Sequence, residues 1–282
     1  MAQGTCALRR AAATDAGAIE CFLAGYAETS MFLRSNLAAH GLGASSTRAA
    51  TDFILAENIS GICGVVGITQ AGYVLAQMPS SDIDLSELRG LWAGRDVLGA
   101  TGVPRHVTAA LTALGIESVQ PAFDQNEPLY ALALDDLERT PIPLRAPVQQ
   151  DYAMLLDWFT AYGTDTGTAF SPEEAERRAT RAIENASVRV LMDQNEPVAM
   201  SAFNATVADM VQVGGVFVPE ARRNHGYGRR VVSGHLQEAR AAGKAHAILF
   251  AANPPAARAY EAMGFTRIGD YRIVMYADPV TI

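Results

Sequence analysis

The stretch Val213–Arg230, which reads Val-Gly-Gly-Val-Phe-Val-Pro-Glu-Ala-Arg-Arg-Asn-His-Gly-Tyr-Gly-Arg-Arg, decides the fold. Its first part, Val213–Val218, is apolar and rich in β-branched residues, which predicts a buried strand. The pair Gly214-Gly215 predicts an irregularity within that strand. Pro219 ends the strand because it has no N–H group to give to the ladder.

A short basic loop, Arg222–Gly228, follows this strand and contains two glycines. The apolar residues beyond it recur at helical spacing, so a helix is predicted to begin at Tyr227 and to end near Gly243. Glycines let backbone N–H groups approach an anion, and the start of a helix adds a partial positive charge. The order strand, glycine loop, helix therefore predicts a phosphate-binding site.

Two familiar phosphate loops do not fit the residues. A P-loop needs Gly-Lys-Ser/Thr, whereas Gly228 is followed by Arg229-Arg230. A dinucleotide fingerprint needs a third glycine where this chain has Val231. What remains is Arg223-x-x-Gly226-x-Gly228, and an ordinary strand–turn–helix connection is the alternative without function.

This loop resembles the pyrophosphate loop of the GCN5-related N-acetyltransferases (GNAT), which hold acyl-coenzyme A. A second apolar run, Ala245–Ala251, precedes the segment Asn253–Phe265. That segment resembles the second signature of the same superfamily: an asparagine, a short helix that ends in Tyr260, and then Gly264-Phe265 opening a strand. Because both signatures occur in the right order and spacing, the chain is identified as a GNAT member.

The composition limits the function classes. With 282 residues, of which 49% are hydrophobic and 18% charged, the chain is long enough for two domains with sizeable cores. Its net charge of −8 argues against a nucleic-acid partner. No signal peptide or membrane-spanning run is present, and Cys6, Cys21 and Cys63 lack metal-ligand spacing. We therefore expect no metal site, reduced buried thiols and a cytoplasmic protein.

Internal similarity predicts a duplication. Leu8-Arg9 is followed by Asp15, and Leu144-Arg145 by Asp151, at an offset of 136 that aromatic residues further on also share. Each unit predicts a short strand followed by an amphipathic helix. A second similarity, at an offset of 127, relates Glu57-Asn58-Ile59-Ser60 to Glu184-Asn185-Ala186-Ser187.

The predicted fold class is α/β (α+β), with two tandem GNAT-like domains, 1–139 and 140–282. The linker is placed at Thr140–Pro143, and the resemblance implies that each domain is a mixed, mostly antiparallel sheet flanked by helices. The first domain lacks the second signature, and its nearest phosphate loop is Gly94–Gly102, before a helix at Val103–Leu114. We interpret it as a degenerate copy that shapes the substrate cleft or forms a dimer contact; a second working site is the alternative.

The resemblance implies an N-acetyltransferase that moves the acetyl group of acetyl-CoA to the amine of a small-molecule or peptide acceptor, by direct attack through a tetrahedral intermediate. A non-catalytic acyl-CoA-binding or regulatory protein is the alternative. Tyr260 is the expected general acid toward the coenzyme sulfur. The residues expected to bind the coenzyme lie on the strand, the loop and the last helix: Val216, Phe217, Val218, Arg223, Asn224, His225, Gly226, Tyr227, Gly228, Arg229, Asn253 and Ala256.

The general base is not identified by the sequence. Family members often place a glutamate where this chain has Gln212, and Gln cannot usefully accept a proton. Asp209 and Asp165 could act through a water molecule, although each fits a solvated carboxylate better. Trp158 and Tyr162 are candidates for the acceptor pocket or for the core. The expected partners are acyl-CoA and an amine, with no nucleic acid and no membrane; a homodimer is left open.

Overall fold

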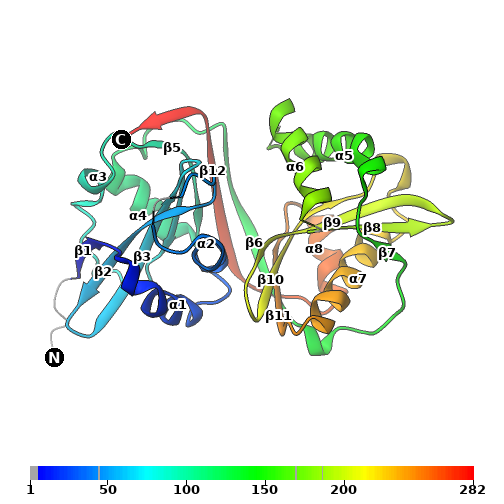
Figure 1. Ribbon diagram of the computed structural model, residues 1–282, viewed down its shortest axis with the longest axis horizontal. Coiled ribbons are helices and arrows are strands. Elements are labelled where there is room, and N and C mark those ends of the chain that lie inside the picture. The colour runs from blue at the N-terminus through cyan, green and yellow to red at the C-terminus, as the bar shows by residue number, and fades with distance from the viewer. Residues whose placement is uncertain (1–5, 44, 169, 186) are drawn as a thin grey trace. The chain divides into compact units, whose positions relative to one another are not determined.

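The computed structural model describes residues 6–282 except 44, 169 and 186 (Figure 1). The chain divides into two compact units. The first unit contains residues 1–127 and 270–282, and the second contains residues 128–269.

The first unit contains a mostly antiparallel sheet in the order β1-β2-β3-β4-β5, to which the last part of β12 adds by pairing with β5. Among the strand pairs described in this unit, β4 and β5 are the parallel pair. The elements are β1 (Ala7–Arg10), α1 (Ala16–Ala24), α2 (Met31–His40), β2 (Thr51–Asn58), β3 (Gly61–Thr69), β4 (Tyr73–Gln77), α3 (Leu88–Leu91), β5 (Asp96–Gly102), α4 (Pro104–Leu114) and β6 (Phe123–Ala133).

Side chains alternate between the two faces of this sheet because successive residues of a strand point to opposite sides. Phe53 and Leu55 of β2 pack in one cluster with residues of α1 and α2. Ile54 lies in another cluster with residues of α4. Helices therefore cover both faces of the first sheet.

The second unit has the strand order β6-β11-β10-β9-β8-β7. Only β10 and β11 pair in parallel among the pairs described here. The elements are β7 (Leu144–Arg145), α5 (Tyr152–Asp165), α6 (Pro172–Glu184), β8 (Val188–Asp193), β9 (Glu196–Thr206), β10 (Met210–Phe217), α7 (Tyr227–Ala241), β11 (His246–Phe250), α8 (Pro254–Glu261) and β12 (Thr266–Thr281).

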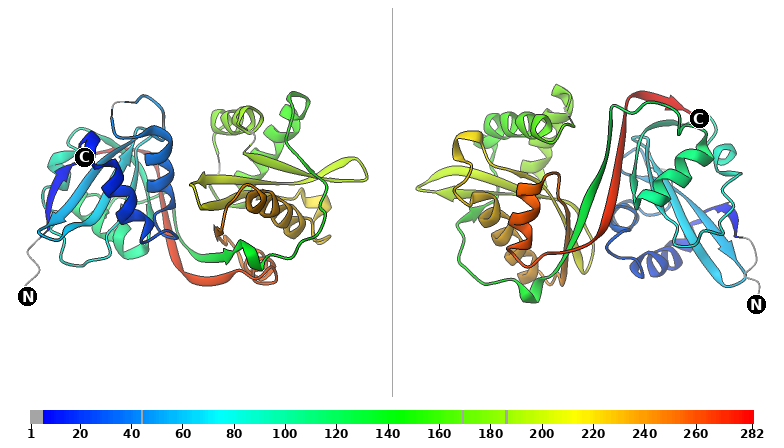
Figure 2. Two further views of the ribbon diagram at one scale, coloured as in Figure 1. Left: turned by 60° about the horizontal axis from the view of Figure 1, so that its bottom comes forward. Right: turned by 180° about the vertical axis from the view of Figure 1, so that it is seen from behind.

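Two hydrophobic clusters hold the second unit together, one on each face of its sheet. Val211 and Val213 of β10 pack with residues of α7 and α8. Met200 and Ala202 of β9 pack with residues of α5 and α6. Figure 2 shows α5 and α6 on one side of these strands and α7 on the other. The mixed, mostly antiparallel sheets with flanking helices confirm the predicted fold class.

The first predicted repeat has the same geometry in both units. Arg9 donates to both carboxylate oxygens of Asp15 at 2.6 and 3.1 Å, and Arg145 does so to Asp151 at 2.6 and 2.8 Å. Each aspartate also accepts the backbone N–H three residues before it, at 2.6 and 2.7 Å. The order of elements from β1 to β5 also matches that from β7 to β11, with α3 in the place of α7.

The second predicted similarity, between the segments at 57–60 and 184–187, is wrong as a structural correspondence. Glu57 and Asn58 end strand β2, and Ser60 lies in the turn before β3, whereas Glu184 ends helix α6. Ala186 lies outside the described residues. The two segments match in residue type alone, because both strand ends and helix ends accept polar residues.

The division into units also differs from the predicted boundary at 139/140. The chain passes from the first unit to the second after Glu127 and returns after Gly269. The reason is strand pairing: Leu129–Ala133 of β6 pair with β11, while Arg272–Thr281 of β12 pair with β5. The predicted linker at Thr140–Pro143 lies inside the second unit.

Two further expectations are corrected. Most of Gly94–Gly102 is strand β5 and not a loop, because Val97 and Ala100 are buried in the cluster beneath α4. The sulfur atoms of Cys6 and Cys63 are bonded at 2.17 Å, and Cys21 is exposed, so the three cysteines are not all reduced and buried. The spacing of the cysteines in the sequence does not indicate that Cys6 lies next to Cys63 of β3. Among the described residues, no helix is both long and apolar enough to cross a membrane.

Candidate functional site

The candidate site lies at an irregularity in β10. The pairing of β10 with β9 shifts register between Gly214 and Phe217, and Gly215 has φ +56°, a backbone conformation that favours glycine. The predicted irregularity at Gly214-Gly215 is thus confirmed. A bulge leaves residues outside the ladder, so the backbone groups of Gly215 and Val216 are the ones that a bound molecule could use.

The parallel pairing of β10 with β11 ends at the same level. Four residue pairs are present, from Met210↔His246 to Val213↔Leu249. Strand β10 continues to Phe217, and β11 continues to Phe250, which pairs with Leu129 of β6 on its other side. The two strands thus stop pairing where the bulge begins.

The glycine loop leads from this point into α7. Gly226 precedes the first helical residue and has φ +75°, and Asn224 has φ +64°. The first N–H groups of an α-helix have no partner within the helix, and they carry the positive end of its dipole. Residues Ala221–Gly226 are exposed. This helix start is therefore a place where an anion can bind.

Carboxylates from neighbouring elements contact the cations of the loop. Arg223 donates to Asp165 at the end of α5 at 2.5 Å, and its Nε donates to the Val218 carbonyl at 3.2 Å. Arg222 pairs with Glu196. Phosphate oxygens would compete with these exposed ion pairs for the same guanidinium groups.

Asp193, the last residue of β8, contacts the first turn of α7. Its carboxylate accepts the Tyr227 hydroxyl at 2.6 Å, and this hydrogen bond raises the pKa of Tyr227. Arg230 lies 3.9 Å from the same carboxylate. Asp193 was not among the residues expected at the site, because the polar residues of Asp193–Glu196 give no information about which helix the hairpin faces.

His225 turns back onto its own loop. Its Nδ1 lies 2.7 Å from the Arg223 carbonyl oxygen, and its ring stacks on Tyr227 with centroids 5.7 Å apart. Arg229 is exposed at the start of α7, and a Cβ added at Gly228 would lie 3.7 Å from Val218. The side chain of Phe217 is buried against Trp158, with centroids 5.9 Å apart, so that only its backbone can face a ligand.

Helix α8 carries the remaining predicted residues. Asn253 caps it, because its Oδ1 accepts the Ala256 N–H at 2.9 Å. Tyr260 is 8% exposed and packs edge-on to Phe265 at 6.0 Å within the cluster beneath α7 and α8. Asn253 thus has a capping role that the sequence analysis did not predict.

Each candidate for the general base has a feature that argues against this role. Gln212 is 1% exposed and cannot titrate. Asp165 is paired with Arg223, and Asp209 stands at the far end of β10, where its carbonyl accepts the Ala245 N–H at 2.8 Å. His235 of α7 is buried and stacked on Phe203 at 3.6 Å; burial, and then the charge of Arg189, lower its pKa to about 3. It stays neutral at physiological pH and is a poor proton acceptor.

The two aromatic candidates for an acceptor pocket lie in the core. Trp158 is buried, and Tyr162 packs against the same cluster, with its ring 6.0 Å from that of Phe170. Core packing accounts for both.

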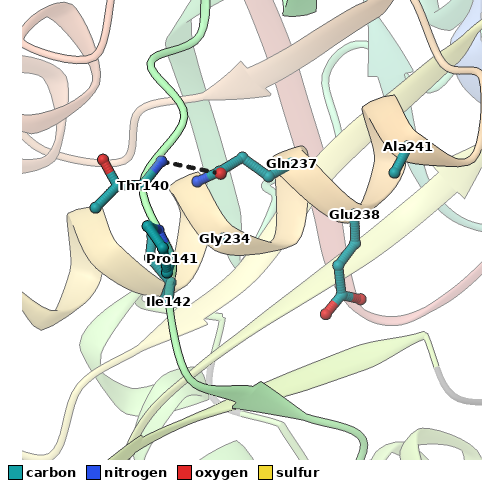
Figure 3. A pocket seen from close by; sticks show the side chains of 7 residues that line it. All are labelled: Thr140, Pro141, Ile142, Gly234, Gln237, Glu238 and Ala241. Carbon is teal, nitrogen blue, oxygen red and sulfur yellow. Dashed lines mark hydrogen bonds between the residues drawn. The ribbon is translucent and has the colours of Figure 1, made fainter.

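A separate shallow cavity of about 240 Å³ lies between α7 and the segment 140–142 (Figure 3). It is lined by Thr140, Pro141, Ile142, Gly234, Gln237, Glu238 and Ala241. The Thr140 N–H donates to Gln237 across it at 3.1 Å. None of the predicted site residues lines this cavity. Among the described residues, no group of three His, Cys, Asp or Glu side chains could hold a metal ion.

Comparison with protein families gives one match, to the Acetyltransferase (GNAT) family, over residues 152–265. These residues span α5 to Phe265, the residue before β12, and include the bulge, the glycine loop and α8. A comparison with curated proteins finds no match.

Solved structures similar to the chain include GNAT proteins along almost its whole length. An acetyltransferase of the GNAT family from Colwellia psychrerythraea has a TM-score of 0.54 at 14% identity, covering 95% of this chain and 99% of that one. A GCN5-related N-acetyltransferase from Sphaerobacter thermophilus has a TM-score of 0.54 at 14% identity, covering 100% and 98%. A tandem GNAT protein from the clavulanic acid biosynthesis pathway has a TM-score of 0.52 at 13% identity, covering 95% and 97%.

Proposed function

Because residues 152–265 form a GNAT-family domain, we propose that this chain is an acyl-CoA-dependent N-acyltransferase. It transfers an acetyl group from acetyl-CoA to the amine of a small molecule or peptide. The observation that carries the proposal is the coincidence of three features at one end of β10: the bulge at Gly214–Gly215, the end of β11 pairing and the Gly226 helix start.

The glycine loop would bind the pyrophosphate of the coenzyme. The N–H groups of Tyr227, Gly228 and Arg229 open α7, and Arg223 stands at the start of the loop. Several charge-assisted hydrogen bonds at a helix start are what a pyrophosphate requires. Phosphate would take the place of Asp165 at the Arg223 guanidinium.

The bulge would hold the acyl end. Backbone N–H groups outside the ladder near Val216 can donate to the thioester carbonyl, where negative charge develops as the amine attacks. Tyr260 would then protonate the departing thiolate. Asn253 and Ala256 open α8 beside the strand end of β11, where the pantetheine arm would pass.

A non-catalytic acyl-CoA-binding protein is the second candidate. The presence of Gln212, which cannot act as a base, is the observation that favours it. Incubation with acetyl-CoA and an amine panel, with free thiol as the readout, separates the two. Coenzyme binding without thiol release in the presence of any amine would contradict the enzymatic proposal.

We expect one coenzyme site per chain. In the first unit, the element in the place of α7 is α3, which has four residues and no glycine loop before it. The Met78 N–H at the end of β4 is also occupied, because it donates to His106 Nδ1 at 3.4 Å. Titration calorimetry with coenzyme A should give a stoichiometry near one. Two equal sites would contradict the interpretation of the first unit as a degenerate copy.

Asp165→Asn should tighten coenzyme binding. The substitution removes a carboxylate that holds Arg223 in the unliganded chain. Exposed ion pairs are worth about 0.2–1 kcal/mol, so the dissociation constant should fall by a factor of about 1.5 to 5. Glu174→Gln, at an exposed ion pair with Arg177 and Arg178 on α6, is the matched control and should leave the affinity unchanged. Weaker binding by Asp165→Asn would mean that Asp165 supports the loop instead of competing with phosphate.

A further inference from the structure

A buried oxygen atom beside the bulge has no partner among the described residues. It is Oε1 of Gln212, on a side chain that is 1% exposed. The orientation of the carboxamide is fixed, because Nε2 donates to the Val213 carbonyl at 2.7 Å and the atom at that position must be the nitrogen. A buried acceptor without a donor costs about 1–3 kcal/mol, so this oxygen needs an explanation.

The register of β10 places Gln212 beside the bulge. Its neighbours Val211 and Val213 pack with α7 and α8, so Gln212 lies on the opposite face of the sheet. It precedes by one residue the last β10–β11 pair, Val213↔Leu249, and by two the bulge at Gly214. A second carboxamide, Asn204 of β9, lies against the backbone of Gly214 in the space that a Cβ there would need.

The three strands at this point carry almost no ionisable side chains. Strand β10 has none over Met210–Phe217. The only one in β11 is His246, which pairs with Met210 at the far end. The only one in β9 is Glu196, its first residue, which pairs with Asp193 of β8. The reacting end of β10 therefore offers carboxamides and backbone groups, and no proton acceptor of its own.

From these observations, and resting on the proposed acyl transfer, we infer that the acceptor is an amine that is substantially uncharged at neutral pH, such as an α-amino group, and that Gln212 Oε1 accepts a hydrogen bond from its N–H. The neutral nitrogen keeps its lone pair for the acyl carbon. A carboxamide can hold such an amine but cannot deprotonate an alkylammonium ion.

The step balances without a side-chain base. The amine nitrogen forms a bond to the acyl carbon, and the C–S bond breaks with its electron pair on sulfur. The nitrogen loses one proton to solvent, and the thiolate takes one from Tyr260, which solvent restores. The products are an amide and free coenzyme A thiol.

The test uses two lysine amides of matched size, both with an amidated carboxyl group, one acetylated at the α-amine and the other at the ε-amine. With pKa values of about 7.8 and 10.4, about one third of α-amino groups but only about 0.1% of ε-amino groups are neutral at pH 7.5. With acetyl-CoA and the full-length chain, kcat/KM for the free α-amine should exceed that for the free ε-amine by about 10²-fold. Equal values, or a preference for the ε-amine, would overturn the inference while leaving acyl transfer established.

Two variants test the role of Gln212 itself. Gln212→Leu should raise KM for the α-amine by about 5- to 30-fold, the loss of one satisfied hydrogen bond of about 1–2 kcal/mol. Gln212→Glu supplies a proton acceptor, so the ratio of kcat/KM for the α-amine to kcat/KM for the ε-amine should fall toward one. Ser201→Ala, a buried polar residue of β9 whose hydroxyl contacts His235, is the control and should keep the wild-type ratio.

Two further outcomes would contradict the inference. If Gln212→Leu folds and keeps both KM and the ratio, Oε1 holds an ordered water and the inference is wrong. If calorimetry shows coenzyme binding but neither lysine derivative nor any other amine releases thiol, the proposed function fails and the inference falls with it. The two failures are thus distinguishable by the presence of thiol release.

Discussion

Tyr260→Phe should lower turnover by about 10²- to 10⁴-fold, the range for a lost general acid or base. The departing thiolate needs a proton, and Tyr260 is the residue of α8 that the family resemblance assigns to that role. Its ring packs with Phe265 in the cluster beneath α7 and α8, and phenylalanine keeps that packing. Steady-state kinetics should therefore show a fall in kcat, while calorimetry shows a coenzyme affinity close to that of the wild type.

Tyr276→Phe is the matched control for this prediction. Tyr276 is also a buried phenol, and its hydroxyl donates to the Ile116 carbonyl at 3.3 Å in the first unit. Loss of this hydroxyl should cost a similar small amount of stability without changing kcat. If turnover of Tyr260→Phe stays within a few-fold of the wild type at every pH tested, water protonates the thiolate and Tyr260 is a packing residue.

Gly226→Val should weaken coenzyme binding by about 10²-fold, equivalent to a loss of about 3 kcal/mol. Gly226 has φ +75°, where a β-branched residue is strained by steric clash within its own backbone. The space around an added Cβ is open, since the nearest atom is Arg229 Nη2 at 4.0 Å. The effect therefore comes from the backbone: the loop must adopt another conformation, and the N–H groups that open α7 no longer converge on a phosphate.

Gly243→Val separates this local effect from lost stability. Gly243 follows the other end of α7, has φ +86° and has nothing within 4 Å of an added Cβ. Both substitutions should lower the thermal midpoint by similar amounts, but only Gly226→Val should lose coenzyme affinity in calorimetry. A folded Gly226→Val protein with wild-type affinity would rule out a phosphate role for the loop.

The two motifs around β10 and α8 could be predicted from the sequence because each depends on neighbouring residues. The bulge follows from Gly214-Gly215, and the helix start follows from Gly226 and the apolar spacing beyond it. The Arg–Asp pairs that open both units also depend on a spacing of six residues. Such local signals survive in the linear chain, since backbone dihedral preferences and side-chain periodicity act over a few residues.

The boundary between units and the partners of the loop could not be predicted in this way. Strand β6 looks like the end of the first half, yet its Leu129–Ala133 pair with β11, and the predicted boundary at 139/140 therefore differs from the structural one. Apolar alternation makes a segment a strand, but it does not specify which sheet edge the segment joins.

The sequence by itself determined the two motifs and the class of the elements that carry them, because these are properties of short stretches of chain. Only the tertiary structure decided that Asp165 contacts the loop, that Asp193 contacts the start of α7 and that Asn253 caps α8. The same holds for the burial of Gln212, one oxygen of which has no partner in the described part of the chain. Whether a polar atom finds a partner depends on groups tens of residues away, which packing alone brings within the 3 Å or so over which a hydrogen bond acts.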